Sequence, residues 1–338
     1  MFADSSKEKL PIDSRIPVTI ITGFLGAGKT TLLNHLIKEY PEKKFAVIEN
    51  EFGEINIDSE LVINTGNNIF ELSNGCICCA LNEDLATLLY ELLESKNKFD
   101  HLLIETTGIA DPGAVALNFI SDFGIQQRYR LDSIVALIDA LNLKTQLVET
   151  EEAAKQIAVS DVLLLNKSSS VEPKELEDVI ESIKNINHTA LIHLCDYSAP
   201  RGINILAIKA FSAKFVLATD FENYEPPTIL KNGLEKKHIH SDINSVSITI
   251  KGKLNPIIFD NWITLLLFSS TLYRIKGVLN MDTFDKKYIF QAVGSQFVGE
   301  LGPDWTNEER INKMVFIGKN LTKKILENGF AKCLIQNE

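Results

Sequence analysis

Residues 23–30 read GFLGAGKT, and this stretch decides the fold. It follows IPVTIIT at residues 16–22, an apolar, β-rich run typical of a strand covered on both faces of a parallel sheet. TLLNHLIKEY at residues 31–40 then has apolar residues at helical spacing and stops before Pro41. A glycine-rich segment with the pattern G-x-x-x-x-G-K-[ST], placed between a buried strand and a helix, predicts a phosphate-binding P-loop.

Each residue type in this loop has a physical reason to be there. Gly23, Gly26 and Gly28 allow the backbone to wrap a phosphate, with successive N–H groups at a helix N-terminus facing it. Lys29 can reach the β- and γ-phosphates, and the Thr30 hydroxyl can bind Mg²⁺. We therefore expect a nucleoside triphosphate with Mg²⁺ at this loop.

A second acidic element is predicted in HLLIETTGIADP at residues 101–112. Glu105 closes an apolar strand, and Gly108 follows three residues later. A carboxylate there can hold Mg²⁺ through water, and the Gly108 N–H can approach the γ-phosphate. The alternative is an ordinary carboxylate at a strand end.

Strands and helices alternate along the first part of the chain, which favours a parallel, doubly wound α/β sheet. After about residue 212 the pattern changes to one typical of a smaller α+β domain with a mainly antiparallel sheet. The segment WITLLLFSSTLY at residues 262–273 is predicted there as a buried helix running into a strand. We expect a polar, mobile tail at 1–15, a nucleotide-binding domain at 16–212, a linker at 213–240 and the C-terminal domain at 241–338.

Composition limits the classes of partner. The chain has 34 basic and 45 acidic residues, a formal charge of −11. Such a surface repels phosphate backbones and anionic lipid, so neither nucleic acid nor a membrane is expected as the main partner. No apolar run reaches the roughly 18 residues of a spanning helix, and the first residues lack the apolar region of a signal peptide. We expect a cytoplasmic protein.

The base-recognition signal is incomplete. VLLLNK ends a predicted strand with Asn166 and Lys167, as in the guanine signature N-K-x-D. The Asp of that signature accepts hydrogen bonds from the guanine N1–H and exocyclic amine. The position is Ser169 here, and a neutral hydroxyl makes weaker hydrogen bonds than a carboxylate. Guanine preference is therefore either weakened or supplied by another group.

Three of the five cysteines, Cys76, Cys78 and Cys79, lie in GCICCA at residues 75–80. One interpretation is structural, as buried small side chains, which we expect for Cys195 and Cys333. A second is redox chemistry, because Cys76 and Cys79 have C-x-x-C spacing. The third is metal binding, since thiolates suit Zn²⁺ and similar soft ions. Three thiolates leave one tetrahedral position open, which favours an ion that is accepted and released.

The ordered set GFLGAGKTTLLNHLI, ENEFGEINID, ELSNGCICC, ETTGIADP and NK resembles the CobW-type metal-handling P-loop GTPases. The N-terminal resemblance covers about residues 16–212, and YRIKGVL, QAVGSQF and KMVFIGKNL extend it to nearly the whole chain. The resemblance implies GTP hydrolysis that alters metal affinity and drives delivery of Zn²⁺, or Co²⁺, to a client metalloprotein.

The resemblance also implies roles for individual residues. Residues 23–31 would bind phosphates, Glu105 would be the Mg²⁺-associated acid, and the three clustered cysteines would be the thiolates for the transferred metal. A nucleotide-sensing switch would lie in ENEFGEINID, with Glu49, Glu51 and Asp58. The full set implied for nucleotide binding is Gly23, Gly26, Ala27, Gly28, Lys29, Thr30, Thr31, Asn166 and Lys167.

Two other functions fit parts of the pattern. A small-molecule P-loop kinase or an ATPase would use the same phosphate loop, with the cysteines incidental. A non-catalytic metal-binding regulator would bind metal without turnover. His238 and His240, at alternate positions of KKHIHSD, make a weak histidine tract and are expected to be solvated instead of acting as ligands. The family resemblance adds that the linker lacks the long histidine tract of some members, so extended zinc buffering is not expected.

Overall fold

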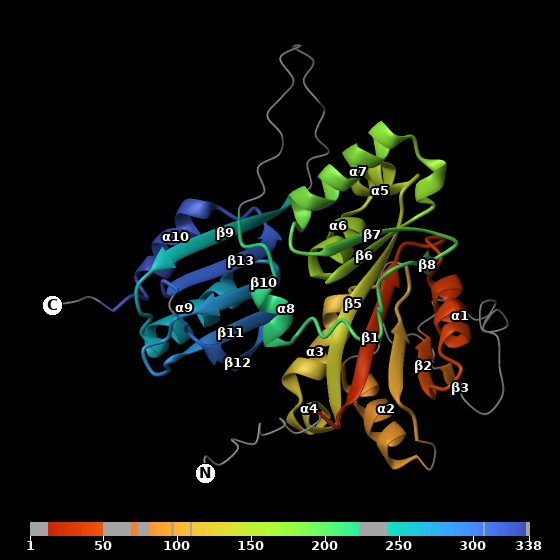
Figure 1. Ribbon diagram of the computed structural model, residues 1–338, viewed down its shortest axis with the longest axis horizontal. Helices are drawn as coiled ribbons and strands as arrows, with labels where there is room; N and C mark the ends of the chain where they lie inside the picture. Colours follow the sequence, from red (N-terminus) through yellow and green to blue (C-terminus); the bar gives the residue numbers. More distant parts are fainter. Residues whose placement is uncertain are drawn as a thin grey trace, which may run out of the picture.

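The structure of the protein is a computed structural model. It describes residues 13–49, 69–73, 82–95, 98–108, 110–222, 242–306 and 308–335. Two sheets organise the chain, a large one built by the first part and a smaller one built by the C-terminal part (Figure 1). The two stand side by side with helices between them.

The large sheet has eight strands. All neighbours are parallel except the last pair, and P-loop strand β1 lies in the interior between β4 and β5. In spatial order the strands are β3 (Ile69–Ser73), β2 (Phe45–Glu49), β4 (His101–Glu105), β1 (Ile16–Gly23), β5 (Tyr129–Asp139), β6 (Val162–Asn166), β7 (Leu191–Asp196) and β8 (Ala199–Pro200).

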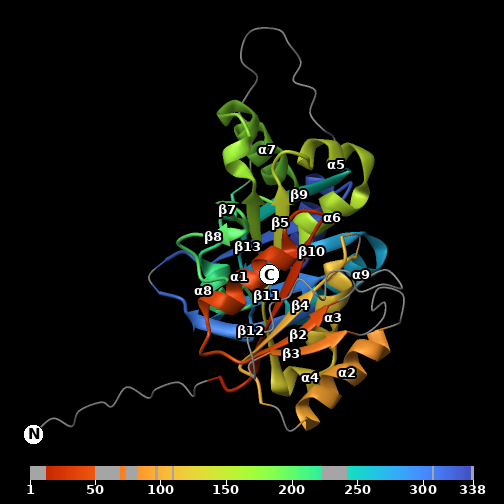
Figure 2. The same ribbon diagram turned by 90° about the vertical axis from the view of Figure 1, so that its right-hand side faces the viewer.

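Helices cover both faces of this sheet, which explains why its central strands are apolar along their whole length. Helix α1 (Lys29–Glu39) buries Leu32, Leu33 and Leu36 against one face. The opposite face is covered by α2 (Asn82–Glu94), α3 (Pro112–Ser121), α4 (Phe123–Arg128), α5 (Leu143–Glu149), α6 (Glu151–Val159) and α7 (Pro173–Ile186). Figure 2 shows α1 and α2 on different sides of the sheet.

The start of α3 follows directly from the sequence ADP. Asp111 is the N-cap residue, and its carboxylate accepts a hydrogen bond from the Gly113 N–H at 2.8 Å. Pro112 occupies the first turn, where its missing N–H costs no hydrogen bond. The cap and the proline thus fix where the chain leaves the segment after Glu105.

The smaller sheet is antiparallel and has the order β12-β11-β10-β13-β9. Helices α9 and α10 cover one of its faces, and Phe259, Phe290 and Phe330 pack together there. A short helix, α8 (Ala213–Leu217), precedes it. Its elements are β9 (Ile243–Lys251), α9 (Pro256–Ser269), β10 (Leu272–Leu279), β11 (Lys286–Val293), β12 (Gln296–Asp304), β13 (Ile311–Lys319) and α10 (Lys323–Ala331). These two sheets confirm the predicted fold class.

Helix α9 differs from the expectation of a buried helix. It does run into a strand, β10, but only Phe259, Ile263 and Leu267 are buried. Leu265 is 69% exposed and Phe268 is 78% exposed. The reason is that α9 lies on the outer face of the small sheet, so that only one stripe of the helix meets the core. The prediction of a buried helix was wrong because the high apolar content of the segment does not mean burial on every side of the helix.

The two sheets share one apolar core. Tyr273 and Ile317 of the small sheet belong to the same buried cluster as Ile157 of α6 and Ile183 of α7. Hydrogen bonds also cross the boundary, because both ring nitrogens of His188 meet serines of β9: Ser245 Oγ at 2.8 Å and Ser247 Oγ at 3.3 Å.

A buried group of charges lies at the same boundary. Asp161 directly precedes β6, and its Oδ1 atom lies 2.8 Å from Arg274 Nη2 and 3.4 Å from Lys276 Nζ, both on β10. All three side chains are at most 1% exposed. The Arg274 guanidinium stacks over Phe211 and the Lys276 ammonium over Phe215. Within the described ranges, no helix is long and apolar enough to cross a membrane.

Candidate functional site

The P-loop sits at the carboxyl edge of the large sheet, and its glycines are required by its geometry. Gly26 and Gly28 have φ values of 76° and 105°, in the left-handed region where a side chain is strained. A Cβ on Gly28 would collide with Ser198 and would lie 2.8 Å from Asn166 Nδ2. The loop is therefore pressed against the ends of β6 and β7 as well as against its own strand.

Lys29 and Thr30 stand at the first turn of α1. Lys29 is 8% exposed, and its ammonium donates hydrogen bonds to the carbonyls of Gly23, at 3.0 Å, and Phe24, at 3.3 Å. Its charge is thus held inside the loop that the sequence predicts for phosphate. The Thr30 hydroxyl donates to Glu105 Oε1 at 3.4 Å. Residues 75 positions apart in the chain are brought together at one edge.

Glu105 has an acidic neighbour in the sheet. Parallel pairing of β2 with β4 places Glu49 directly beside Glu105, and pairing of β2 with β3 places Ser73 beside Glu49. Carboxylate and hydroxyl oxygens are the ligands that Mg²⁺ prefers. Thr30 and Glu105 are the residues that fit such an ion. No group of three or more His, Cys, Asp and Glu side chains suited to a metal occurs within the described ranges.

Gly108 lies against the P-loop. A Cβ at this position would lie 2.7 Å from the Leu25 backbone nitrogen. Gln156 of α6 donates to the Gly108 carbonyl at 3.0 Å and helps to fix this turn. The segment after Glu105 therefore reaches the phosphate loop from the opposite side to Asn166.

Asn166 joins three segments of the site. Its Nδ2 atom donates to the Ala27 carbonyl at 2.9 Å and to Ser198 Oγ at 3.0 Å, while its Oδ1 atom accepts from the Ser198 N–H at 3.0 Å. Ser198 in turn donates to the Gly28 carbonyl at 2.9 Å. Asn166 thus links the end of β6 to the P-loop and to the turn after β7.

Lys167 points back over the P-loop. Its ammonium lies 2.7 Å from Asp139 Oδ2 at the end of β5 and donates to the Gly26 carbonyl at 3.2 Å. Burial alone would raise the pKa of Asp139, but hydrogen bonds from Lys167 and Asn142 outweigh it and lower that pKa below its usual value. Asp139 therefore remains ionised and holds Lys167 in place.

Ser169 has a partner that sequence reasoning missed. Its N–H and its hydroxyl both donate to Asp196 Oδ1, at 3.1 and 2.9 Å. Asp196 is the last residue of β7, and its only sequence signal was its position at the end of a predicted strand next to the one that carries Asn166. A carboxylate is thus present beside Ser169, the position at which the guanine signature N-K-x-D has its Asp.

Several predicted residues lie outside the described ranges: Glu51, Asp58, Cys76, Cys78, Cys79, His238 and His240. The chain enters the cysteine segment directly after Ser73, at the edge that carries Glu49. Cys195 and Cys333 are 5% and 0% exposed, which confirms the expectation of buried side chains. Burial raises the pKa of each thiol to about 11. Thr31 is exposed on the first turn of α1.

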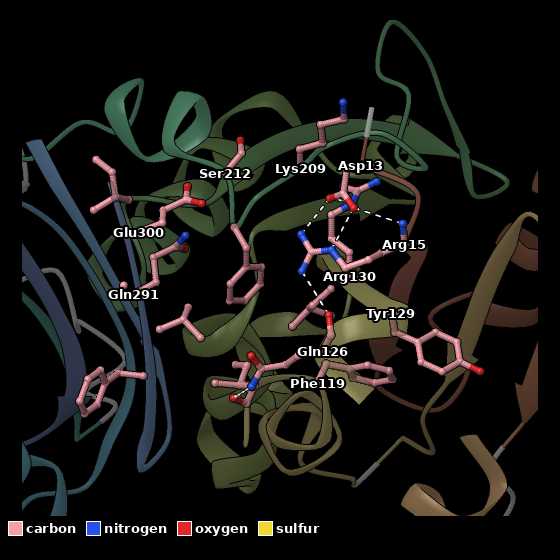
Figure 3. A pocket seen from close by; sticks show the side chains of 17 residues that line it. Asp13, Arg15, Phe119, Gln126, Tyr129, Arg130, Lys209, Ser212, Gln291 and Glu300 are labelled. Carbon is pink, nitrogen blue, oxygen red and sulfur yellow. Dashed lines mark hydrogen bonds and ion pairs between the residues drawn. The ribbon is translucent and has the colours of Figure 1, made fainter. Parts of the chain in front are cut away.

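A cavity of about 850 Å³ lies elsewhere, between the start of β5 and the small sheet (Figure 3). Asp13 pairs there with Arg15 at 2.8 Å and Arg130 at 3.3 Å, so this part of the expected tail is held in place. The Arg15 hydrogen bond lowers the pKa of Asp13 to about 2. Arg130 and Asp139 stand nine positions apart in β5, or about 30 Å. The cavity is therefore separate from the phosphate site.

Comparison with known proteins agrees with this geometry. Residues 17–193 match the family model "CobW/HypB/UreG, nucleotide-binding domain", and residues 243–334 match "Cobalamin synthesis protein cobW C-terminal domain". The chain belongs to the CobW/HypB/UreG family. Since the first match covers the P-loop, Glu105 and Asn166, the family assignment and the site rest on the same residues.

Individual relatives match over nearly the full chain. Zinc chaperone YjiA of Escherichia coli is 34% identical, with 94% of this chain and 98% of the relative covered. Zinc-regulated GTPase metalloprotein activator 1 of Schizosaccharomyces pombe is 32% identical, with 90% and 83% covered. The crystal structure of Zn(II)-bound YjiA GTPase has a TM-score of 0.73 at 30% identity, covering 95% of this chain and 99% of that one. These findings confirm the prediction of a P-loop GTPase of the CobW type.

Proposed function

We propose that this protein is a GTP-hydrolysing zinc chaperone that delivers its metal to a client metalloprotein. The observation that carries the proposal is the shared edge of β4, β2 and β3. Glu105 accepts a hydrogen bond from Thr30, and this pair would hold the Mg²⁺ that accompanies GTP. Glu49 is the neighbour of Glu105 in the sheet, and the strand next to Glu49 precedes the cysteine segment in the chain. The names of the relatives, zinc chaperone and zinc-regulated GTPase metalloprotein activator, support the same conclusion.

Each residue has a defined part in the proposed cycle. Lys29 and the P-loop N–H groups neutralise charge on the β- and γ-phosphates, and Thr30 with Glu105 would hold Mg²⁺, which supplies charge neutralisation during phosphoryl transfer. The Gly108 N–H contacts the γ-phosphate. Loss of that phosphate releases the segments that it had ordered. The switch residues are Glu49, Glu51 and Asp58.

The cargo would be Zn²⁺, with Co²⁺ as the second candidate, held by Cys76, Cys78 and Cys79. Cys76 follows Ser73 by three residues in the sequence, a stretch that spans at most about 10 Å. A conformational change at the edge that carries Glu49 would therefore reach the thiolates. Linkage makes the coupling reciprocal: if GTP tightens zinc binding by some factor, zinc tightens GTP binding by the same factor.

A metal titration tests the proposal. Zn²⁺ affinity is measured on the whole protein without nucleotide, with GDP and with a non-hydrolysable GTP analogue. The three affinities are expected to differ, and Cys76→Ala and Cys79→Ala are each expected to abolish tight stoichiometric binding while nucleotide affinity is retained. Cys333→Ala removes a buried thiol of the C-terminal domain and serves as the matched control. Equal affinity in all three nucleotide states would contradict the coupling.

A further inference from the structure

The structure assigns guanine recognition to a carboxylate that lies outside the N-K-x-D segment: we propose that Asp196, held by Ser169, is the specificity-determining residue for the base. The inference deepens the proposed function and rests on it, because it takes the P-loop nucleotide to be a guanine nucleotide. It also explains how a chain with Ser169 in place of the expected Asp can belong to a family of GTPases.

The chemistry of guanine calls for a carboxylate at this place. Guanine presents two donors on one edge, the N1–H and the exocyclic amine, whereas adenine presents an acceptor at N1. A carboxylate accepts from both guanine donors, and hydrogen bonds to an ionised group are roughly twice as strong as neutral ones. Ser169 alone offers one neutral hydroxyl oxygen, which binds these two donors more weakly than the two oxygens of an ionised carboxylate.

The contacts of Asp196 leave it able to do this. Both hydrogen bonds from Ser169 go to the same oxygen, Oδ1. The Oδ2 atom has no hydrogen-bond partner in the part of the chain that the structure describes. Ser169 is exposed and Asp196 is half-buried, so the pair faces solvent at the edge of the sheet. The Ser169 hydroxyl, instead of binding the base, orients the neighbouring carboxylate.

The turn after Asp196 is fixed relative to the phosphate loop. Tyr197 and Ser198 have φ values of 52° and 54°, a left-handed conformation that costs a non-glycine residue of order 1 kcal/mol. The strain is offset where Ser198 bonds to Asn166 and to the Gly28 carbonyl. Asp196 lies two positions before Ser198. The hydrogen bond from Ser198 to the Gly28 carbonyl therefore fixes the position of the Asp196 backbone relative to the P-loop.

A purely structural role is the competing explanation, since Asp196 also accepts the Ser169 N–H at the start of the short 3₁₀ helix at residues 168–170. Asp196→Asn separates the two roles. The Asn side chain keeps one oxygen for the Ser169 N–H but loses the charge and the second acceptor. Its amide is a donor, which matches the C2 carbonyl of xanthine instead of the guanine amine.

The test measures dissociation constants for GDP, IDP, XDP and ADP by calorimetry. For Asp196→Asn, we expect GDP affinity to fall about 10-fold to 150-fold, XDP affinity to rise, and ADP affinity to stay unchanged. The double variant Ser169→Asp with Asp196→Asn is expected to recover GDP affinity. Asp282→Asn, at an exposed ion pair in the C-terminal domain, is the matched control.

Wild-type protein provides a second arm that does not depend on the variant folding. IDP lacks the exocyclic amine, so it is expected to bind about 10-fold or more weakly than GDP. Equal affinity for IDP and GDP, or a GDP affinity within twofold of wild type in folded Asp196→Asn, would overturn this inference and leave the proposed function standing. Wild-type protein that binds ADP as well as GDP would contradict the proposed function itself.

Discussion

The two ends of β6 carry buried polar groups that are satisfied in different ways. At the carboxyl end, the neutral amide of Asn166 meets neutral partners on the P-loop and on Ser198. At the amino end, the single carboxylate of Asp161 faces two cations, Arg274 and Lys276. The first end can accept and release a ligand without leaving a buried charge unpaired. The second joins the two domains through an excess of positive charge, stabilised partly by the rings of Phe211 and Phe215.

The largest effect on stability is expected from Asp161→Asn. The substitution keeps an acceptor for the Ile134 N–H, which Asp161 binds at 3.1 Å, but leaves both cations uncompensated. Breaking a buried pair in this way costs about 3–5 kcal/mol. Urea unfolding measures the loss. Asp178→Asn, at a part-exposed pair with Lys144, is the control and is expected to cost about 0–1 kcal/mol; an equal loss in both would refute the contrast.

Lys29→Ala tests the P-loop, which contacts the carboxyl end of β6 through Asn166. We expect GTP turnover to fall by about 10²–10³-fold, the size of effect seen when one charge-stabilising donor is lost. The free energy of unfolding should change far less than in Asp161→Asn, because the Lys29 ammonium donates to the neutral carbonyls of Gly23 and Phe24 in its own loop. Single-turnover hydrolysis and urea unfolding of the same sample measure both quantities. Turnover at the wild-type rate would contradict the phosphate assignment.

Lys276→Met removes one of the two cations at the amino end of β6, so that Asp161 and Arg274 remain there as a neutral pair. Burial lowers the pKa of Lys276 to about 8, against the attraction of Asp161. Between about pH 8 and the unfolded value near 10.5, the unfolded chain binds the extra proton, so wild-type stability should rise with pH by up to roughly 3 kcal/mol.

The variant lacks this titration and is expected to be as stable as wild type at pH 7, or more stable, because Asp161 keeps one partner in Arg274. The measurement is the free energy of unfolding of both proteins from pH 7 to 10. Parallel profiles would show that Lys276 does not titrate with a lowered pKa.

A smaller loss of stability than in Asp161→Asn is expected from His188→Ala. Each lost hydrogen bond to Ser245 or Ser247 is worth about 0.5–1.5 kcal/mol. Burial lowers the pKa of His188 below its usual value, so the folded protein resists protonation and wild-type stability should fall as the pH drops below about 6.5. Thermal unfolding at pH 7.5 and 5.5 should show a smaller pH-dependent loss in the variant. An identical loss would assign the pH effect to another group.

The sequence was informative where one segment contains the whole signal. The strand, glycines, lysine and threonine of the P-loop are contiguous, and Glu105 and Asn166 each end an apolar run. What it could not supply was the spatial order of strands. The order in the sheet is not the order in the chain, so neither the pairing of Glu49 with Glu105 nor the contact of Ser169 with Asp196 could be derived.

Two further features depended on tertiary packing. Arg274 and Lys276 lie in YRIKGVL, where alternation of charged and apolar residues is typical of a half-exposed strand, yet both are 1% exposed because α6 and α8 cover that face. Helix α9 shows the reverse error, since an apolar segment proved to be exposed along one side. Burial of a side chain depends on what packs over it, and those elements are distant in sequence.

The apolar core shared by the two sheets has a consequence for synthesis on the ribosome. Helices α6 and α7 are complete by residue 186, whereas β13, which supplies Val315 and Ile317 to that core, ends at Lys319. At about 5–20 residues per second, translation of the stretch from 187 to 319 takes roughly 7–27 s. Throughout that interval the apolar side chains of α6 and α7 that will pack against β13 are exposed to solvent. Premature termination or slow codons in this stretch would therefore favour aggregation over productive folding.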